Sequence, residues 1–394
     1  MSAPETVTHD VLIVGAGLPG MALALALRGS GLSVALVDRQ QPAVSDDDAW
    51  DARIYAISPG NAQFLHRMGV WSRIDCERLT AVESMRIFGD RAGSQLDFSA
   101  FDSGERALAW IVEQRQLHSA TLAAWAAADA PEKLYTGSPR ALLREHERST
   151  LELDDGTRVT ARLIVGADGL HSWTRDQAGL GGKVRSYGQT AVVANFATEQ
   201  PHHGRAWQWF QSDGGVLAWL PLGGRRMSIV WSAPEAKADE LLAMAEAEFS
   251  AAVASAGASV LGGLEPLTAR ASFPLSFMRL PRMVAPRLAL VGDAAHGIHP
   301  LAGQGLNLGY GDAAALAEVL RDRGPIADSG AALLLGRYAR MRAMPTLAMQ
   351  AMTDGLWRLF NARQAVPVAV RNRGMAFLNR LPMVKTILMQ PALR

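Results

Sequence analysis

A glycine-rich turn near the N-terminus restricts the fold of this chain more than any other feature. The pattern Gly15-x-Gly17-x-x-Gly20 lies between a short apolar run, residues 10–14, and a helix-forming run, residues 21–27. Glycine is needed where the turn is tight, where the backbone approaches a pyrophosphate and where helix packs closely on strand. The helix N-terminus then offers free N–H groups to phosphates. These residues predict a Rossmann-like α/β unit that binds a dinucleotide.

An acidic residue stands at the end of the second predicted strand, where a dinucleotide-binding unit needs a carboxylate. The second apolar strand, residues 33–37, ends at Asp38. An acidic side chain at this place accepts hydrogen bonds from the adenosine ribose. NAD and FAD share the adenosine half and the pyrophosphate, so the N-terminal residues alone leave the dinucleotide open.

A later segment favours FAD. Residues 287–291 read as another buried strand, which stops at Gly292-Asp293. A carboxylate at the end of a central strand suits the ribityl hydroxyls of FAD. Residues 299–307 then lead into a helix that we expect from about Gly305 to Leu320. The N-terminal N–H groups of that helix are expected to face the flavin pyrimidine edge, where reduction leaves negative charge.

At these motifs the chain resembles the group A flavoprotein monooxygenases, which are built like p-hydroxybenzoate hydroxylase. The resemblance covers almost the whole length. It implies an α/β fold with a Rossmann-like FAD-binding domain, an inserted β-sheet substrate domain and a helical C-terminus. The residues that carry it are Gly15, Gly17 and Gly20 with Asp38, Arg53 in Asp51-Ala52-Arg53, Asp168, Gly169 and Arg175 within residues 165–175, and Gly292 with Asp293.

The resemblance also implies roles. The glycine turn and Asp38 resemble the FAD adenosine site, and Arg53 resembles the arginine that reaches the FAD pyrophosphate. The motif of Asp168, Gly169 and Arg175 is associated with both FAD and the nicotinamide donor, so either cofactor stays open for these residues.

Three further assignments rest on the family. Arg115 falls where the family has a helix residue that packs against the flavin, and a surface salt bridge is the alternative. Asn307 is expected to contact the cofactor. The flavin-positioning loop, with no acid or base residue assigned, consists of Pro300, Gly303, Gln304 and Gly305.

Within the family, the chain is most similar to the ring hydroxylases of ubiquinone biosynthesis. Residues 299–309 and 353–360 carry this similarity, as do residues 370–374 and Leu381-Pro382. Gly311 departs from it, since many of these enzymes have a larger or basic residue there.

The resemblance implies a reaction. NAD(P)H or a protein electron donor reduces FAD, O2 adds to the reduced flavin, and the resulting flavin hydroperoxide hydroxylates the ring of a polyprenylated phenol or quinol. The cofactor carries this chemistry, while the protein orients the ring and excludes water. Two alternatives stay open: a flavin monooxygenase of a soluble aromatic compound, and a non-catalytic FAD-binding subunit of a biosynthetic assembly.

The domain organisation follows from where strands are expected. The FAD-binding domain takes residues 1–75, 100–184 and 286–345, and the substrate domain takes residues 76–99 and 185–285. Strands at 189–196, 206–210, 215–221 and 227–231 are expected to form its sheet, with their tryptophans in the core or in the wall of a substrate pocket. The proline-containing residues 272–283 are predicted to be irregular.

The C-terminal segment, residues 346–394, is predicted to be basic and helical. From Leu356 onward it has no acidic residue, and its basic residues are Arg358, Arg363, Arg371, Arg373, Arg380, Lys385 and Arg394. This pattern suits contact with an anionic membrane surface or with a membrane-bound complex of ubiquinone biosynthesis. A solvated basic face over buried core is the alternative.

Composition excludes several classes. A net charge of +1 argues against a nucleic-acid partner. The single cysteine, Cys76, and the lack of a signal or spanning segment favour a cytoplasmic protein, peripheral at most on the inner face of the membrane. Asp293, His296 and His299 raise the idea of a metal site, but the glycine-rich helix start favours a flavin loop, and we expect no metal.

Overall fold

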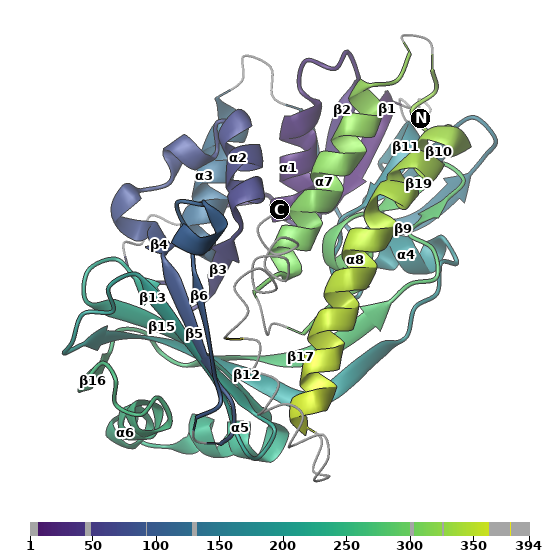
Figure 1. Cartoon of the computed structure of the whole chain (residues 1–394). Helices are drawn as coiled ribbons and strands as arrows, with labels where there is room; N and C mark the ends of the chain where they lie inside the picture. Colours follow the sequence, from purple (N-terminus) through teal and green to yellow (C-terminus); the bar gives the residue numbers. More distant parts are fainter. Residues whose placement is uncertain are drawn as a thin grey trace.

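The computed structural model describes residues 7–43, 49–91, 93–127, 132–299, 303–324, 327–361 and 379. Two large sheets dominate it, with helices packed on the first sheet and one long helix, α8 (Ala332–Asn361), running from the first sheet to the second (Figure 1). This α/β architecture confirms the predicted fold class.

The first sheet has eight strands in the order β18-β19-β11-β1-β2-β8, with β10 paired to β11 and β9 to β10. The central strands β19, β11, β1, β2 and β8 are parallel. Their carboxyl ends therefore meet at one edge, where ligands bind in open α/β sheets. The strands are β1 (Val7–Val14), β2 (Val34–Asp38), β8 (Lys133–Thr136), β9 (Pro139–Arg144), β10 (Ser149–Leu153), β11 (Arg158–Gly166), β18 (Val284–Ala285) and β19 (Leu288–Leu290).

The second sheet has nine strands in the order β20-β17-β12-β15-β14-β13-β5-β6, with β16 paired to β12. All its pairs are antiparallel except β13 with β5. The strands are β5 (Ser84–Phe88), β6 (Gln95–Ser99), β12 (Val184–Thr198), β13 (Arg205–Phe210), β14 (Val216–Leu222), β15 (Arg226–Pro234), β16 (Leu264–Pro266), β17 (Ala271–Arg279) and β20 (His296–Gly297).

A small antiparallel sheet has the order β3-β7-β4. In the chain, its strands come between strands of the first sheet and strands of the second. This small sheet consists of β3 (Ile54–Ile57), β4 (Thr80–Val82) and β7 (Ala109–Glu113). Thus the segment 76–99 contributes to two different sheets, and the domain boundaries stay a prediction.

The remaining helices are short except α7. They are α1 (Leu18–Leu27), α2 (Pro59–Arg67), α3 (Gln114–Ala126), α4 (Trp173–Gln177), α5 (Glu235–Ala243), α6 (Glu246–Ala256) and α7 (Gly305–Arg321), with 3-10 turns η1 (Trp71–Arg73), η2 (Cys76–Arg78), η3 (Phe101–Ser103) and η4 (Gly292–Ala294). No helix in these described ranges is both long enough and apolar enough to cross a bilayer.

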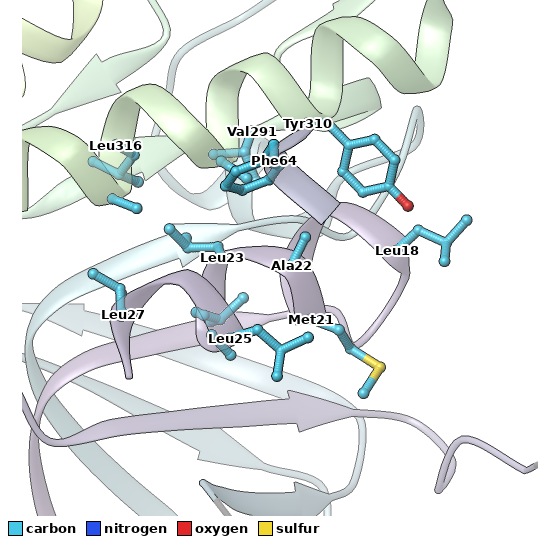
Figure 2. Packing of buried hydrophobic residues seen from close by; sticks show 14 of the residues in the cluster. Leu18, Met21, Ala22, Leu23, Leu25, Leu27, Phe64, Val291, Tyr310 and Leu316 are labelled. Carbon is cyan, nitrogen blue, oxygen red and sulfur yellow. The ribbon is translucent and has the colours of Figure 1, made fainter. Parts of the chain in front are cut away.

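Helix α1 lies in the main core. It is apolar on all sides, as expected of a helix enclosed by other elements. Figure 2 shows side chains of α1, among them Leu23 and Leu27, close to Phe64, Tyr310 and Leu316 from α2 and α7. This packing holds the N-termini of α1 and α7 near the same sheet edge.

The tryptophans of the second sheet belong to its own core. Trp207 and Trp209 contact Trp219 edge-on, with ring centroids 6.4 and 5.1 Å apart. All three side chains are buried in one cluster. They therefore stabilise the sheet, and the alternative placement in a pocket wall does not apply to them.

The prediction of an irregular segment at 272–283 is wrong, because β17 covers most of it. Pro274 pairs with Thr190 next to a register shift in β12. On the other side of β17, strand β20 reaches only Met278 and Arg279. A proline is tolerated where a strand has a free edge or a bulge beside it, which is the situation of Pro274.

Candidate functional site

Four strand ends form the site. Backbone hydrogen bonds join the loops that follow β1, β2, β11 and β19: Gly15 N–H donates to Val37 O (2.8 Å), Ala167 N–H to Val14 O (2.7 Å) and Val291 N–H to Gly166 O (2.9 Å). The sheet thus brings four motifs together that lie far apart in the chain: the glycine turn, Asp38, Asp168 and Gly292-Asp293.

Glycine occurs at the three positions of the turn for different physical reasons. A Cβ on Gly15 would lie 2.4 Å from Ala167 O, and one on Gly20 would lie 2.0 Å from Gly15 O. Gly17 is exposed, and a Cβ added there would meet no atom of the described residues within 4 Å. Gly15 and Gly20 are therefore required by the fold, while Gly17 leaves open space above the N-terminus of α1. That helix has no side-chain cap, so its N–H groups stay free for phosphate oxygens.

The Asp38 carboxylate accepts a hydrogen bond from the backbone of the glycine turn. Its Oδ2 accepts a hydrogen bond from Ala16 N–H at 2.7 Å, and its Oδ1 accepts one from Gln40 N–H at 3.4 Å. A carboxylate has about four acceptor positions, so the group retains capacity for ribose hydroxyls.

Asp293 lies beside Arg53 and Tyr55. Its side chain stays open to solvent on one side although protein atoms crowd the carboxyl group. This burial raises the pKa of Asp293, while His296 and Arg53 oppose the shift. The Arg53 guanidinium lies over the rings of Phe273 and Tyr55, 5.0 and 5.8 Å from their centroids. The cation and the carboxyl group are thus held on the same side of the first sheet.

The predicted flavin loop leads into α7 as expected, and the helix ends one residue later than predicted. Gly303 has a φ of +61°, a conformation that favours glycine, and its Cβ position would lie 3.2 Å from the Cβ of Ala56. Gln304 is buried, while Gly305 starts the helix next to open space. Among the described residues, no side chain caps the α7 N-terminus. Pro300 lies outside the described residues.

Comparison with known proteins identifies the family of this chain. Residues 8–352 match the family described as FAD binding domain. The chain belongs to this family. It is an FAD-dependent monooxygenase, which confirms the resemblance stated from the motifs.

Relatives match the monooxygenase over nearly its whole length. The ubiquinone hydroxylase UbiL of Rhodospirillum rubrum is 37% identical over 98% of this chain and 89% of its own. The 3-demethoxyubiquinol 3-hydroxylase of Escherichia coli is 34% identical, covering 95% and 96%. The human mitochondrial ubiquinone biosynthesis monooxygenase COQ6 is 30% identical, covering 98% and 93%.

Solved structures agree on the fold. PqsL of Pseudomonas aeruginosa, described as a probable FAD-dependent monooxygenase, has a TM-score of 0.76 at 25% identity, with 93% of this chain and 99% of that chain covered. The p-nitrophenol 4-monooxygenase PnpA of Pseudomonas putida shares the fold, with a TM-score of 0.77, 18% identity and 99% of each chain covered.

Residues of the Asp-Gly motif of the monooxygenase form hydrogen bonds with other groups of the protein. The Asp168 carboxylate accepts hydrogen bonds from the Ser172 hydroxyl and from Thr174 N–H. Arg175 is buried, and its Nη1 donates to Leu170 O (2.9 Å) and Ala294 O (3.4 Å). Gly169, with a φ of +82°, makes the turn between them. In this structure Arg175 fixes the motif against η4, and cofactor contact by Asp168, Gly169 and Arg175 stays a prediction.

Arg115 and Arg53 are both tied to Asp51, which the sequence did not single out as a contact. The Asp51 carboxylate accepts hydrogen bonds from Arg53 N–H at 2.9 Å and Arg115 N–H at 3.2 Å. Arg115 Nη1 also donates to Ala49 O at 3.3 Å. The position of Arg115 beside the start of β3 fits either a cofactor contact or a positioning role.

A buried charge cluster under Gly292-Asp293 was missed by sequence reasoning. Asp312, on α7, accepts hydrogen bonds from Gly292 N–H (2.9 Å), His296 Nε2 (2.6 Å) and Arg342 Nε (2.6 Å). The carboxylate is fully buried. It links η4 to α7 and α8, so it sets the position of the turn that carries Asp293. We call His296, Asp312 and Arg342 the buried charge cluster.

The pKa shifts in this cluster favour the charged forms of both His296 and Asp312. Burial alone would lower the pKa of His296, but the Asp312 carboxylate raises it above the ordinary value of 6.5. Burial would raise the pKa of Asp312, but His296 and Arg342 lower it below 3.8. Within the part of the chain that the structure describes, no three His, Cys, Asp or Glu side chains gather as metal ligands.

The cluster explains the departure at Gly311. A Cβ at this position would lie 2.9 Å from Arg342 Nη2 and 3.0 Å from its Nη1. The missing side chain leaves room for the guanidinium, which also donates to Leu308 O at 3.0 Å.

Asn307 connects the flavin loop to the β3–α2 segment. Its amide donates to Ala56 O at 2.7 Å and accepts from Ser58 N–H and Asn61 Nδ2, both at 3.0 Å. The predicted cofactor contact of Asn307 stays a prediction, but its described bonds are structural.

We therefore expect an Asn307→Ala variant to lose about 2–3 kcal/mol of unfolding free energy, because three polar groups, two of them buried, would lose their partner. Urea unfolding of the FAD-loaded protein measures this loss. Asn361→Ala, at the end of α8, is the control: its Nδ2 bonds to Trp357 O and Gly214 O lie in a partly exposed position. Equal losses in the two variants would contradict the structural role of Asn307.

Proposed function

We propose that this monooxygenase hydroxylates the aromatic ring of a polyprenylated phenol or quinol in ubiquinone biosynthesis. The single observation that supports the substrate is the near full-length similarity to relatives named as ubiquinone hydroxylases and as 3-demethoxyubiquinol 3-hydroxylase. Enzymes of this class take electrons from NAD(P)H and an oxygen atom from O2, and a protein electron donor is the alternative reductant in our proposal.

The residues fit FAD. Open space above Gly17, the uncapped N-terminus of α1 and the retained acceptor capacity of Asp38 suit the pyrophosphate and adenosine. Arg53 would add a cation for the pyrophosphate. Asp293, crowded by protein but open on one side, would accept hydrogen bonds from the ribityl chain.

The chain's own residues would then orient and shield the reaction. When bound, FAD accepts electrons from the donor and activates O2 for transfer to an electron-rich ring carbon. The N–H groups at the start of α7, preceded by Gly303 and Gln304, would stabilise negative charge on the reduced ring system. The buried charge cluster holds the Asp293 turn in place, and Arg175 holds η4. No side chain is needed as the oxygen carrier.

Lipid analysis tests the substrate class. Cells that lack the gene are expected to lose ubiquinone and to accumulate a prenylated precursor one ring oxygen short. The wild-type gene should restore ubiquinone, whereas an Asp293→Ala copy should not. Mass spectrometry of lipid extracts reads both species. Unchanged ubiquinone in a strain with no second hydroxylase would contradict the proposal and direct attention to soluble aromatic substrates.

We further propose a peripheral contact with an anionic membrane or a membrane-bound biosynthetic complex. On one face of α8, Met344 and Leu347 are exposed, and Arg340 is exposed one turn before Met344. Apolar side chains next to a cation suit such a surface. Of the basic residues named for this role, Arg363, Arg371, Arg373, Arg380, Lys385 and Arg394 lie outside the described residues.

Vesicle sedimentation tests the membrane contact. The full chain is expected to sediment with vesicles rich in anionic lipid more than with zwitterionic ones, and less at high salt. A Met344→Ser, Leu347→Ser double variant should sediment less. Equal sedimentation with both vesicle types would contradict an electrostatic contact.

A further inference from the structure

A hydrogen-bonded chain fixes the chemical form of His299, the residue before the predicted flavin loop. Gln189 Nε2 donates to Gly214 O at 2.9 Å, so Oε1 of the same amide is the acceptor end. Trp357 Nε1 donates to that Oε1 at 3.0 Å, which agrees, because an indole N–H can only donate. His299 Nε2 lies 3.0 Å from the same oxygen. His299 therefore carries its hydrogen on Nε2.

The other ring nitrogen is left as a free acceptor. Burial lowers the pKa of His299 to about 4, with Asp354 opposing the shift, so the imidazole is neutral at physiological pH. Its Nδ1 then has a lone pair and no hydrogen. This atom is buried, and none of the residues that the structure describes gives it a hydrogen bond. A buried acceptor without a donor is costly, so such an atom indicates a place that a ligand completes.

The surroundings of His299 are aromatic. The Tyr187 ring packs edge-on against the imidazole with centroids 4.8 Å apart, and Trp357 lies 4.8 Å from Tyr187. Arg185 covers the Tyr187 ring, and its charge is paired with Asp354 at 2.8 Å. An apolar ring that carries a polar oxygen matches these surroundings.

Three parts of the fold meet at this place. Tyr187 and Gln189 come from β12 of the second sheet, Trp357 comes from α8, and His299 follows η4 and β20 after the Gly292-Asp293 turn. His299 thus lies where the second sheet and α8 meet the segment that leads from the Gly292-Asp293 turn towards α7. The residue belongs to the candidate site by position, although no role follows for it from the motifs.

We propose that His299 Nδ1 accepts a hydrogen bond from a ring hydroxyl of the aromatic substrate, and that Gln189 and Trp357 hold the imidazole in the tautomer that makes this possible. The inference deepens the proposed function and rests on it. A hydroxyl that donates to Nδ1 gains electron density on its oxygen and on the ring. Oxygen transfer to the ring consumes such density, so this bond would orient and activate the substrate. Gln189 and Trp357 are positioning residues.

Ligand binding without turnover tests this. The probes are a phenol with a short prenyl tail and its O-methyl ether, titrated into the oxidised, FAD-loaded protein in the absence of reductant. Flavin absorbance or calorimetry reports each Kd. The wild-type chain is expected to prefer the phenol by about tenfold, the effect of one good hydrogen bond. His299→Phe should lose this preference while it still binds the ether as the wild type does.

A second variant keeps the test informative if His299→Phe folds poorly. Trp357→Phe removes only the N–H donor. It is expected to reduce the preference for the phenol from about tenfold to about threefold. His146→Gln, at an exposed site, is the matched control and should keep the wild-type preference. Nitrogen NMR of labelled histidine should show the Nε2–H tautomer for His299 and a shift of Nδ1 when the phenol binds.

The outcomes are distinguishable. If neither probe binds the wild-type chain, the proposed function fails. If the wild type prefers the phenol and His299→Phe keeps that preference, or if the wild type binds phenol and ether equally, the role of His299 is wrong while the function stands.

Discussion

A Gly20→Ala variant is expected to lose FAD and to unfold at a lower urea concentration than the wild-type chain. The added methyl group would lie 2.0 Å from Gly15 O, which is backbone and cannot move aside as a flexible side chain does. Overpacking in a well-packed core costs about 1–3 kcal/mol, and this contact is at the upper end because it also separates α1 from β1. The turn that holds the pyrophosphate would be displaced with it.

Gly17→Ala is the informative partner of that variant. In the part of the chain that the structure describes, no atom lies within 4 Å of the added methyl group, and the backbone at Gly17 is extended, with φ −71°. We expect the stability of the FAD-free protein to stay within about 0.5 kcal/mol of wild type, as for other substitutions away from packed features. FAD affinity should nevertheless fall at least tenfold, because the methyl group occupies the phosphate approach.

Urea unfolding of the FAD-free proteins and fluorescence titration with FAD separate these effects. Gly324→Ala serves as the neutral control, because no atom of the described residues lies within 4 Å of its Cβ position. A Gly20→Ala chain that retains wild-type stability, or a Gly17→Ala chain that retains wild-type FAD affinity, would contradict the roles assigned to the turn.

The buried charge cluster gives the second large effect. Asp312→Ala would leave His296 and Arg342 buried without their carboxylate, and removing one partner of a buried ion pair costs about 3–5 kcal/mol. Because Gly292 N–H would also lose its acceptor, we expect weaker FAD binding as well. Glu152→Gln is the control: its partner Arg158 is half exposed at 3.0 Å, and such surface pairs contribute about 0–1 kcal/mol. Similar losses in both variants would refute the importance of the cluster.

The cluster also predicts a pH dependence of stability. The pKa of His296 is raised in the folded state, so its contribution is complete below the ordinary value of 6.5 and is lost as the pH rises through the folded pKa. The pKa of Asp312 is lowered, so its contribution is complete above 3.8 and is lost as the pH falls through the folded pKa. The difference in unfolding free energy between wild type and Asp312→Ala should therefore be largest between about pH 4 and 6.5.

Residues that act through local structure could be predicted from the sequence. The strand, glycine turn and helix from β1 to α1, the start of α7 at Gly305 and the placement of Asp38 and Asp293 at strand ends all follow from short-range rules. Because parallel strands put their carboxyl ends at one edge, even the meeting of these motifs was predictable. Pro274 shows the limit: its strand depends on a neighbouring strand far away in sequence.

The sequence by itself therefore determined the fold class, since periodicity and turn chemistry are local properties of the chain, and its motifs carried the resemblance that indicated the family. Only the tertiary structure decided which polar groups are buried together. Asp312 meets His296 and Arg342, and His299 meets Gln189, 110 positions earlier in the chain. Ionisation and tautomer depend on such contacts, because desolvation and hydrogen bonding are set by neighbours in space, and no spacing rule in one chain encodes them.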